Sequence, residues 1–174
     1  RNTTLGKPKA RCSPELDALA AYVTSLNVIH PSPYRNADGS LTADAKAGKE
    51  IFKKANCAAC HSGADFTDSA KLLLHDVGTI SKTSGQRMHE TLFGLDTPTL
   101  RGIWETAPYL HDGSASTLLD VLTSANSKGL HGDLSKITDA EKIQLAAYLQ
   151  QIDNVEEAAP ESAVPVAIKA GELP

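Results

Sequence analysis

Aromatic side chains make up only 5% of this chain of 174 residues, and it contains a single methionine. No apolar run approaches the roughly 18 residues that a membrane-spanning helix needs, so we expect no membrane span. No block of Lys and Arg is present, the net charge is −4 and the pI is about 5.8. Nucleic acids and anionic membranes are therefore not expected as partners. The chain begins with Arg1 and Asn2 and no signal peptide, so we expect a processed product or an excised fragment.

Cysteine is also scarce, with three residues in the chain. Two of them fall in one short motif and Cys12 stands alone, a distribution that excludes a disulfide framework. Three interpretations of Cys12 stay open: a free thiol, half of a bridge to sequence outside this chain, or no role.

Hydrophobic periodicity and capping signals predict four helices. The last has the clearest start, because Thr138 and Glu141 form a capping box. The expected helices run from Pro14 to before Pro31, from Thr42 or Asp44 to about Ala55, from Ser116 or Thr117 through Leu122, and from Thr138 to Ile152.

Composition divides the chain into three parts. Residues 1–40 are predicted to be a helix and a Pro-rich linker, 41–153 a domain, and 154–174, rich in Glu, Ala and Pro, a flexible tail or linker. The sequence LAAYV at 19–23 is repeated as LAAYL at 145–149. This similarity is either chance, or it marks the residues before about Asn27 as the last helix of a preceding, related domain.

The sequence CAACH at 57–61 is the motif that carries chemistry. Two thiols at this spacing reach two vinyl groups on one edge of a porphyrin, and the next histidine then points at the iron. A zinc site would need two more ligands, and a thioredoxin-like pair would need a βαβ context; the sequence indicates neither. We therefore predict that Cys57 and Cys60 attach one haem c covalently and that His61 is its ligand. A haem would also supply the large apolar body that the few aromatic side chains do not.

Residues 48–149 resemble the C-terminal haem domain of the bacterial diheme cytochrome c peroxidase superfamily, which also contains a cofactor-maturing diheme enzyme and diheme rubber oxygenases. The resemblance is carried by GKEIF at 48–52, the haem motif, FTD at 66–68, HDVGT at 75–79, DTPTLRG at 96–102 and TAPYLHDGS at 106–114. It implies an all-α, class I cytochrome c fold with crossing N- and C-terminal helices. Gly48 suits such a crossing, because a glycine lets two helices approach closely.

The resemblance also implies roles outside the haem motif. Arg101 matches an arginine that pairs with a haem propionate, and a guanidinium is a suitable donor for a partly buried carboxylate. The alternative for Arg101 is an exposed surface residue. Thr106 and Pro108 match backbone positions that bind calcium between two haem domains. That site also needs a group from the other domain, so this chain alone does not complete it.

The second axial ligand of the iron is less clear. In the peroxidases a Met follows the HDG string, but the matching position here is close to Ala125 and no Met is near it. His131 resembles the distal histidine of branches with two histidine ligands, so we predict His131. Met88, His75, His111 and an open iron are the alternatives. A Met ligand would raise the reduction potential relative to a second histidine.

These features predict electron transfer through one haem, as a relay to a redox partner protein or a second haem domain, in the bacterial periplasm or outside the cell. The alternative is the electron-transfer half of a diheme peroxidase or oxygenase. Such an enzyme needs a second haem with an accessible iron, and this chain has one CxxCH, so we do not expect the isolated chain to be an enzyme. A haem-bearing docking module in a large assembly is a third hypothesis.

Overall fold

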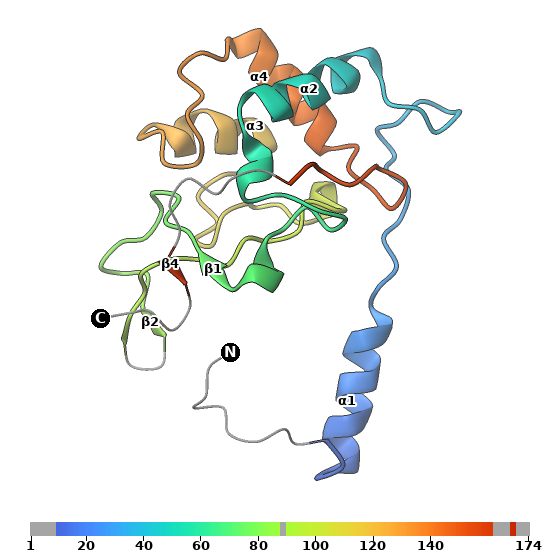
Figure 1. Cartoon of the computed structure of the whole chain (residues 1–174), viewed down its shortest axis with the longest axis vertical. Coiled ribbons are helices and arrows are strands. Elements are labelled where there is room, and N and C mark those ends of the chain that lie inside the picture. The colour runs from blue at the N-terminus through green and yellow to red at the C-terminus, as the bar shows by residue number, and fades with distance from the viewer. Residues whose placement is uncertain (1–9, 88–89, 162–167, 170–174) are drawn as a thin grey trace.

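The computed structural model describes residues 10–87, 90–161 and 168–169, and in this part the protein is predominantly helical (Figure 1). This content agrees with the predicted all-α class. Extended structure there consists of two antiparallel pairs of two-residue strands and three isolated antiparallel bridges. The elements are α1 (Pro14–Ser25), α2 (Ala43–Lys54), η2 (Cys57–Ala59), η3 (Ser69–Lys71), β1 (Leu73–Leu74) paired with β4 (Ile168–Lys169), β2 (Gln86–Arg87) paired with β3 (Glu90–Thr91), η4 (Ile103–Glu105), α3 (Leu118–Leu122), η5 (Ser124–Asn126) and α4 (Asp139–Leu149), where η denotes a 3-10 helix.

Capping side chains set the starts of the two helices that form the core. The Thr42 side chain accepts a hydrogen bond from the Ala45 N–H at 3.2 Å, which begins α2. At α4, Thr138 accepts from the Glu141 N–H at 3.2 Å, and Glu141 accepts from the Thr138 N–H at 2.8 Å. The predicted capping box is therefore present, and such a cap stabilises a helix by about 1 kcal/mol.

The core forms where α2 crosses α4, at Gly48 (Figure 1). A Cβ on Gly48 would lie 2.0 Å from the Gln144 carbonyl oxygen and 2.8 Å from the Tyr148 Cβ, so only glycine allows this approach. Next to the crossing, the rings of Phe52 and Tyr148 meet edge to face with centroids 5.6 Å apart. The close helix crossing that the sequence predicts is thus a feature of the structure.

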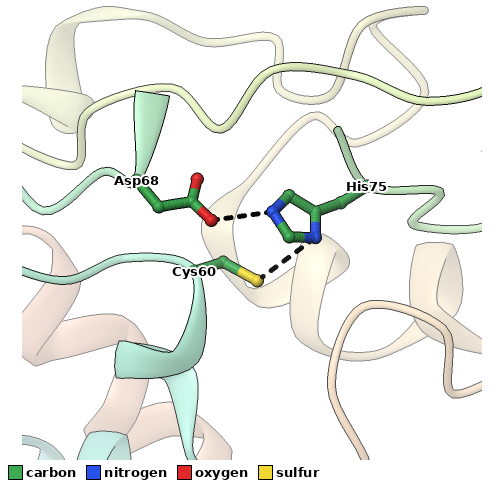
Figure 2. A group of neighbouring side chains, drawn as sticks. All are labelled: Cys60, Asp68 and His75. Atoms are coloured by element: carbon green, nitrogen blue, oxygen red, sulfur yellow. Dashed lines mark hydrogen bonds and ion pairs between the residues drawn. The ribbon is translucent and has the colours of Figure 1, made fainter. Parts of the chain in front are cut away.

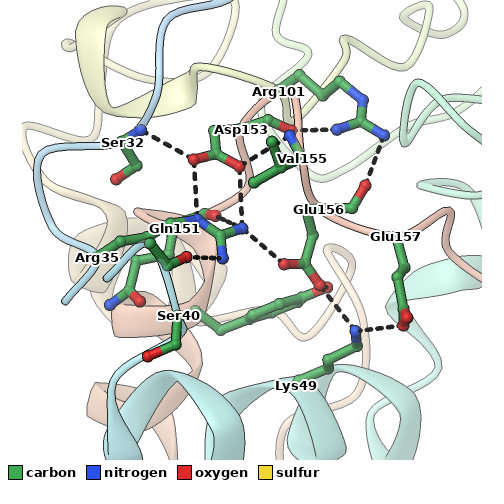
Figure 3. Close-up of polar contacts among 12 residues, drawn as sticks. Ser32, Arg35, Ser40, Lys49, Arg101, Gln151, Asp153, Val155, Glu156 and Glu157 are labelled. Carbon is green, nitrogen blue, oxygen red and sulfur yellow. Dashed lines mark hydrogen bonds and ion pairs between the residues drawn. The ribbon is translucent and has the colours of Figure 1, made fainter. Parts of the chain in front are cut away.

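A buried cluster of charged side chains joins the segment before α2 to the segment after α4 (Figure 3). The Arg35 guanidinium donates to both carboxylate oxygens of Asp153 at 2.8 and 2.9 Å and to Glu156 at 2.8 Å. Glu156 also accepts from Lys49 on α2 at 2.8 Å and from the Tyr148 hydroxyl at 3.3 Å. Two cations thus face two buried carboxylates, so the buried charges are paired.

The packed body extends beyond both predicted domain boundaries. On the N-terminal side, the backbone N–H of Ser32 donates to Asp153 at 2.9 Å. On the C-terminal side, Glu156 and Ala159 are buried, and Ala159 pairs with Gly63 in an antiparallel bridge. Glu156 and Ala159 therefore pack against the body from within the segment that the sequence predicts as a tail, and the division into domains stays a prediction. Of the rest of that predicted tail, only Ile168 and Lys169 lie within the described residues.

Helix α1 projects away from this body (Figure 1) and buries none of its residues. Ser13 caps it and Pro14 occupies its first turn, as the sequence predicts. Its large apolar side chains are nevertheless mostly exposed: Leu16, Leu19, Tyr22 and Val23, together with Leu26 just after the helix. Within the described ranges, no helix is long and apolar enough to cross a membrane.

Candidate haem site

The CxxCH segment follows α2 after one residue in a left-handed conformation. Asn56, with φ of 55°, turns the chain out of α2 and into η2. The segment then closes on itself, because the N–H of His61 donates to the Cys57 carbonyl at 3.0 Å. Ala58 and Ala59 between the cysteines are buried, which anchors the motif to the core.

The Nδ1 atom of His61 lies 3.2 Å from the Phe66 carbonyl oxygen. Because a carbonyl can only accept, Nδ1 carries the proton and the lone pair of the neutral ring is on Nε2. Burial, and to a smaller extent the neighbouring His131, lower the pKa of His61 to about 4. His61 is therefore neutral at physiological pH, which is the protonation state of imidazole that binds a metal.

The imidazole of His131 lies near that of His61, although the two residues are 70 positions apart in the sequence. Their ring centroids are 6.3 Å apart and their planes are tilted by 38°. Two imidazoles that bind one metal ion from opposite sides hold their centroids roughly 6.3 Å apart when each metal–nitrogen bond is about 2.0 Å. Burial also lowers the pKa of His131, so both imidazoles are neutral and each has a nitrogen lone pair that can bind a metal. The distance between the two rings thus matches what two histidine ligands of one metal ion would have.

The two thiols of the motif are protonated at neutral pH. Burial raises the pKa of Cys57 to about 12, and burial followed by the charge of Asp68 raises that of Cys60. Both are free cysteines, as is the exposed Cys12. Within the described chain there is no zinc-type set of four ligands around them; the single group of at least three metal-binding side chains contains Cys60, Asp68 and His75.

Those three residues form a linear chain of contacts (Figure 2). His75 Nε2 lies 2.8 Å from a carboxylate oxygen of the buried Asp68, and His75 Nδ1 lies 3.6 Å from the Cys60 sulfur. The second carboxylate oxygen of Asp68 has no partner within the described residues. Both ring nitrogens of His75 are thus in contact with other side chains, one of them with the sulfur of Cys60.

Arg101 is in contact with backbone and with an aromatic ring. Its guanidinium donates to the carbonyls of Ala64 at 2.6 Å and Glu156 at 3.0 Å, and to that of Asp153. Its central carbon lies 5.3 Å from the centroid of the buried Phe66 ring. These contacts tie the loop after the haem motif to the C-terminal segment. The pairing of Arg101 with a propionate stays a prediction.

The remaining candidates from the sequence do not face His61 in the described part of the chain. The ring nitrogens of His111 contact the hydroxyls of Thr79 at 2.9 Å and Ser84 at 3.2 Å, on an exposed surface. Met88 lies outside the described residues, so the alternative that Met88 is a ligand stays a prediction. Calcium binding by Thr106 and Pro108 also stays a prediction.

Two features of the site were not predicted from the sequence. The sequence indicates Asp68 only as part of the FTD string. Its contact with His75 depends on the turn between the two residues. Asn126 bonds to the loop that carries His131, at 2.9 to 3.1 Å. An Asn six residues before a glycine is a common loop pattern, so no sequence signal would have identified it.

Comparisons with known proteins identify a cytochrome c-like family and several relatives. The family model "RoxA-like, cytochrome c-like" matches residues 94–130. The gamma subunit of hydrazine synthase from Kuenenia stuttgartiensis is 34% identical over 175 residues, which cover 79% of this chain and 48% of that protein. A chain in a solved structure of K. stuttgartiensis hydrazine synthase, pressurised with 20 bar xenon, superposes with a TM-score of 0.66 at 35% identity, over 80% of this chain and 55% of that one.

Two further relatives are shorter matches. The methylamine utilization protein MauG of Methylophilus methylotrophus is 34% identical over 66% of this chain and 38% of the relative. Cytochrome c peroxidase Ccp of Escherichia coli is 30% identical over 59% of this chain and 25% of the relative. The chain thus spans about half the length, or less, of the curated relatives it matches.

Proposed function

We propose that this chain, a cytochrome c-like domain related to the diheme cytochrome c peroxidase-like superfamily, transfers electrons through one haem attached at Cys57 and Cys60, with His61 and His131 as its axial ligands. The observation that carries the proposal is the spacing of the two imidazoles, whose centroids are 6.3 Å apart. A bound haem supplies a one-electron ferric–ferrous couple.

The residues around the two histidines suit electron transfer better than binding of a substrate. The hydrogen bond from His61 Nδ1 to Phe66 fixes the tautomer and the orientation of that ring. With His61 and His131 both holding the iron, no coordination position would be left open to a small molecule. Two histidines also favour a lower reduction potential than a histidine and a methionine.

Arg101 is proposed to bind a haem propionate in addition to its backbone contacts. A guanidinium has five N–H groups. Three of them are donated to carbonyls of Ala64, Asp153 and Glu156. Two N–H groups on the terminal nitrogens therefore remain for a carboxylate.

The second candidate function is the electron-transfer half of a larger diheme enzyme. It is favoured by the short coverage of the relatives, of which the chain spans 48% or less. In either case we propose that α1 is the last helix of a preceding, related domain and that the protein acts in the bacterial periplasm or outside the cell. The full-length gene product distinguishes the two, since a second CxxCH upstream would favour the enzyme.

The axial ligands are tested by the spin state of the ferric protein. We expect a low-spin spectrum without a Met–iron charge-transfer band at the red end of the visible range. His131→Ala should give a high-spin form that binds cyanide or carbon monoxide quickly. His111→Ala is the matched control and should leave the spectrum unchanged. If Met88→Leu produces the high-spin form and His131→Ala does not, the haem is a His/Met haem and the proposal is wrong.

A further inference from the structure

His131 lies in a loop that has no regular secondary structure to fix it. The loop runs over residues 127–132, directly after η5, whose last residue is Asn126. Gly129 and Gly132 have φ of +67° and +79°, and nothing lies within 4 Å of a Cβ built on either. Both glycines are thus required by the backbone conformation and not by crowding. The position of His131 must be determined by contacts elsewhere in the loop.

The side chain of Asn126 supplies these contacts, since it bonds to the backbone on both sides of the His131 side chain. Its Oδ1 accepts from the N–H of His131 at 2.9 Å. Its Nδ2 donates to the carbonyls of His131 at 3.1 Å and Gly132 at 3.0 Å. Only this orientation of the amide matches a donor with each acceptor. The side chain of Asn126 thereby pairs with both the N–H and the carbonyl of His131.

The other face of the loop rests on the HDVGT segment. Gly78, with φ of +83°, lies against Leu130, whose Cδ1 would be 3.1 Å from a Cβ at that position. Leu130 directly precedes His131. Leu130 thus contacts Gly78, while the backbone of His131 is bonded to Asn126. The loop thus has contacts on two sides, through the half-exposed Leu130 at Gly78 and through Asn126, which bonds to the backbone of His131.

We infer that Asn126 is a positioning residue that holds His131 in the ligating position and so keeps the haem closed to external ligands. This inference rests on the proposed function. Ligation by a loop residue competes with opening of the loop, which gains conformational entropy. Hydrogen bonds that order the loop in advance reduce the entropy lost on ligation, so the open form is rarer. Asn126 thereby determines whether the iron serves as a relay or as a binding site for small molecules.

The test measures carbon monoxide binding to the ferrous holoprotein. If the closed form limits entry, the observed rate follows the open fraction, so Asn126→Ala should bind carbon monoxide about tenfold faster than the wild type, or more. Asn126→Asp keeps the acceptor for the His131 N–H but loses both donors, so it should fall between the two. The matched control is Asn36→Ala, because Asn36 closes another turn by donating to Ser40 and Leu41 at 3.0 and 3.2 Å.

Two further outcomes separate this inference from the proposed function. If His131→Ala binds carbon monoxide no faster than the wild type, then His131 is not the ligand and the proposed function fails. If His131→Ala binds it quickly but both Asn126 variants keep the wild-type rate, the positioning role is overturned. Hydrogen exchange on the unmutated protein gives an answer even where a variant does not fold: the amide of His131 should exchange slowly, and rapid exchange contradicts the inference.

Discussion

Phe66 is the residue at which the contacts of the candidate haem site meet. It is fully buried and has a φ of 51°, which is unusual for a bulky residue. Its carbonyl oxygen fixes the tautomer of His61, while its ring lies under the guanidinium of Arg101. A change at Arg101 is therefore expected to reach His61 through Phe66, even though no contact between Arg101 and His61 is involved.

Replacement of Arg101 by leucine should lower both stability and reduction potential. Three carbonyls lose a charged donor, which should cost about 2–4 kcal/mol in the free energy of unfolding. Loss of a positive charge near the iron favours the ferric state, so the midpoint potential should fall. Urea unfolding and redox titration measure the two effects. Arg101→Lys should recover little, since an ammonium lacks the planar fork. If stability falls but the potential is unchanged, Arg101 does not bind a propionate.

Covalent attachment should depend on two of the three cysteines. Acid–acetone extraction should leave the haem on the polypeptide of the wild type and of Cys12→Ala, because thioethers from Cys57 and Cys60 hold it. The double variant with Cys57→Ala and Cys60→Ala should lose its haem to the solvent. Absorbance of the precipitated protein measures the outcome. Complete extraction from the wild type would show that the motif is not used.

At the scale of single residues, the sequence is informative where chemistry restricts spacing. The CxxCH motif follows from what an iron porphyrin needs, and the choice of His131 follows from the family resemblance; the structure places the rings of His61 and His131 6.3 Å apart, and their role as ligands stays a prediction. The contacts of Asn126 and the Asp68–His75 pair were beyond prediction. They depend on how a loop closes in three dimensions, which leaves no periodic trace in the sequence.

Among the elements, the crossing of α2 and α4 tolerates the least change. Gly48→Ala would place a methyl group 2.0 Å from the Gln144 carbonyl oxygen, so the helices would have to separate. We expect a loss of about 3 kcal/mol or more in the free energy of unfolding, as for other over-packed cores. Denaturant unfolding measures it, with Lys46→Ala on the exposed side of α2 as a control that should change little. Similar stabilities for both variants would refute the tight crossing.

Helix α1 should contribute nothing to the stability of the body. Leu19 and Tyr22 are 56% and 61% exposed, whereas their counterparts in the repeated sequence, Leu145 and Tyr148, are 0% and 2% exposed. Leu19→Glu should therefore leave the melting temperature unchanged, while Leu145→Glu should prevent folding by burying a charge. Calorimetry compares them. A lower melting temperature for Leu19→Glu would mean that α1 packs on its own body.

Helix positions were predictable because caps and apolar periodicity are local signals. Thr138 with Glu141, and Thr42, start their helices where the sequence places them. The end of the body was not predictable from composition. Residues 154–161 have the composition of a tail, yet Glu156 and Ala159 are buried through partners about 100 positions away, such as Arg35, Lys49 and Gly63.

On the scale of the whole molecule, the buried charge cluster makes stability depend on pH. Burial alone would raise the pKa of Asp153, but hydrogen bonds from the Ser32 N–H and the Arg35 guanidinium outweigh it and hold the pKa below its usual value. A lowered pKa means that the stabilisation is complete above the unfolded value of about 3.9 and is lost as the pH falls further. The free energy of unfolding of the wild type, measured with urea, should therefore decrease below about pH 4.

The matched variant isolates this contribution. Asp153→Asn removes the ionisable group but keeps the size of the side chain, so it should be less stable at neutral pH and flatter than the wild type between about pH 4 and pH 2. Other carboxylates and the site histidines titrate in both proteins and cancel in the difference. Parallel curves for the two proteins would contradict the assignment of Asp153.

The joining of Ser32 and Arg35 to Asp153 and Glu156 also has a mechanical consequence. These contacts close residues 36–152 into a loop that contains the haem motif and His131. When the segments on either side of this loop are pulled apart, the force acts first on the ion pairs, and the axial ligands are strained only after those pairs have broken. A domain tethered in a larger assembly would thus keep its redox properties under tension, and single-molecule pulling would detect the break as an extension that precedes any change at the haem.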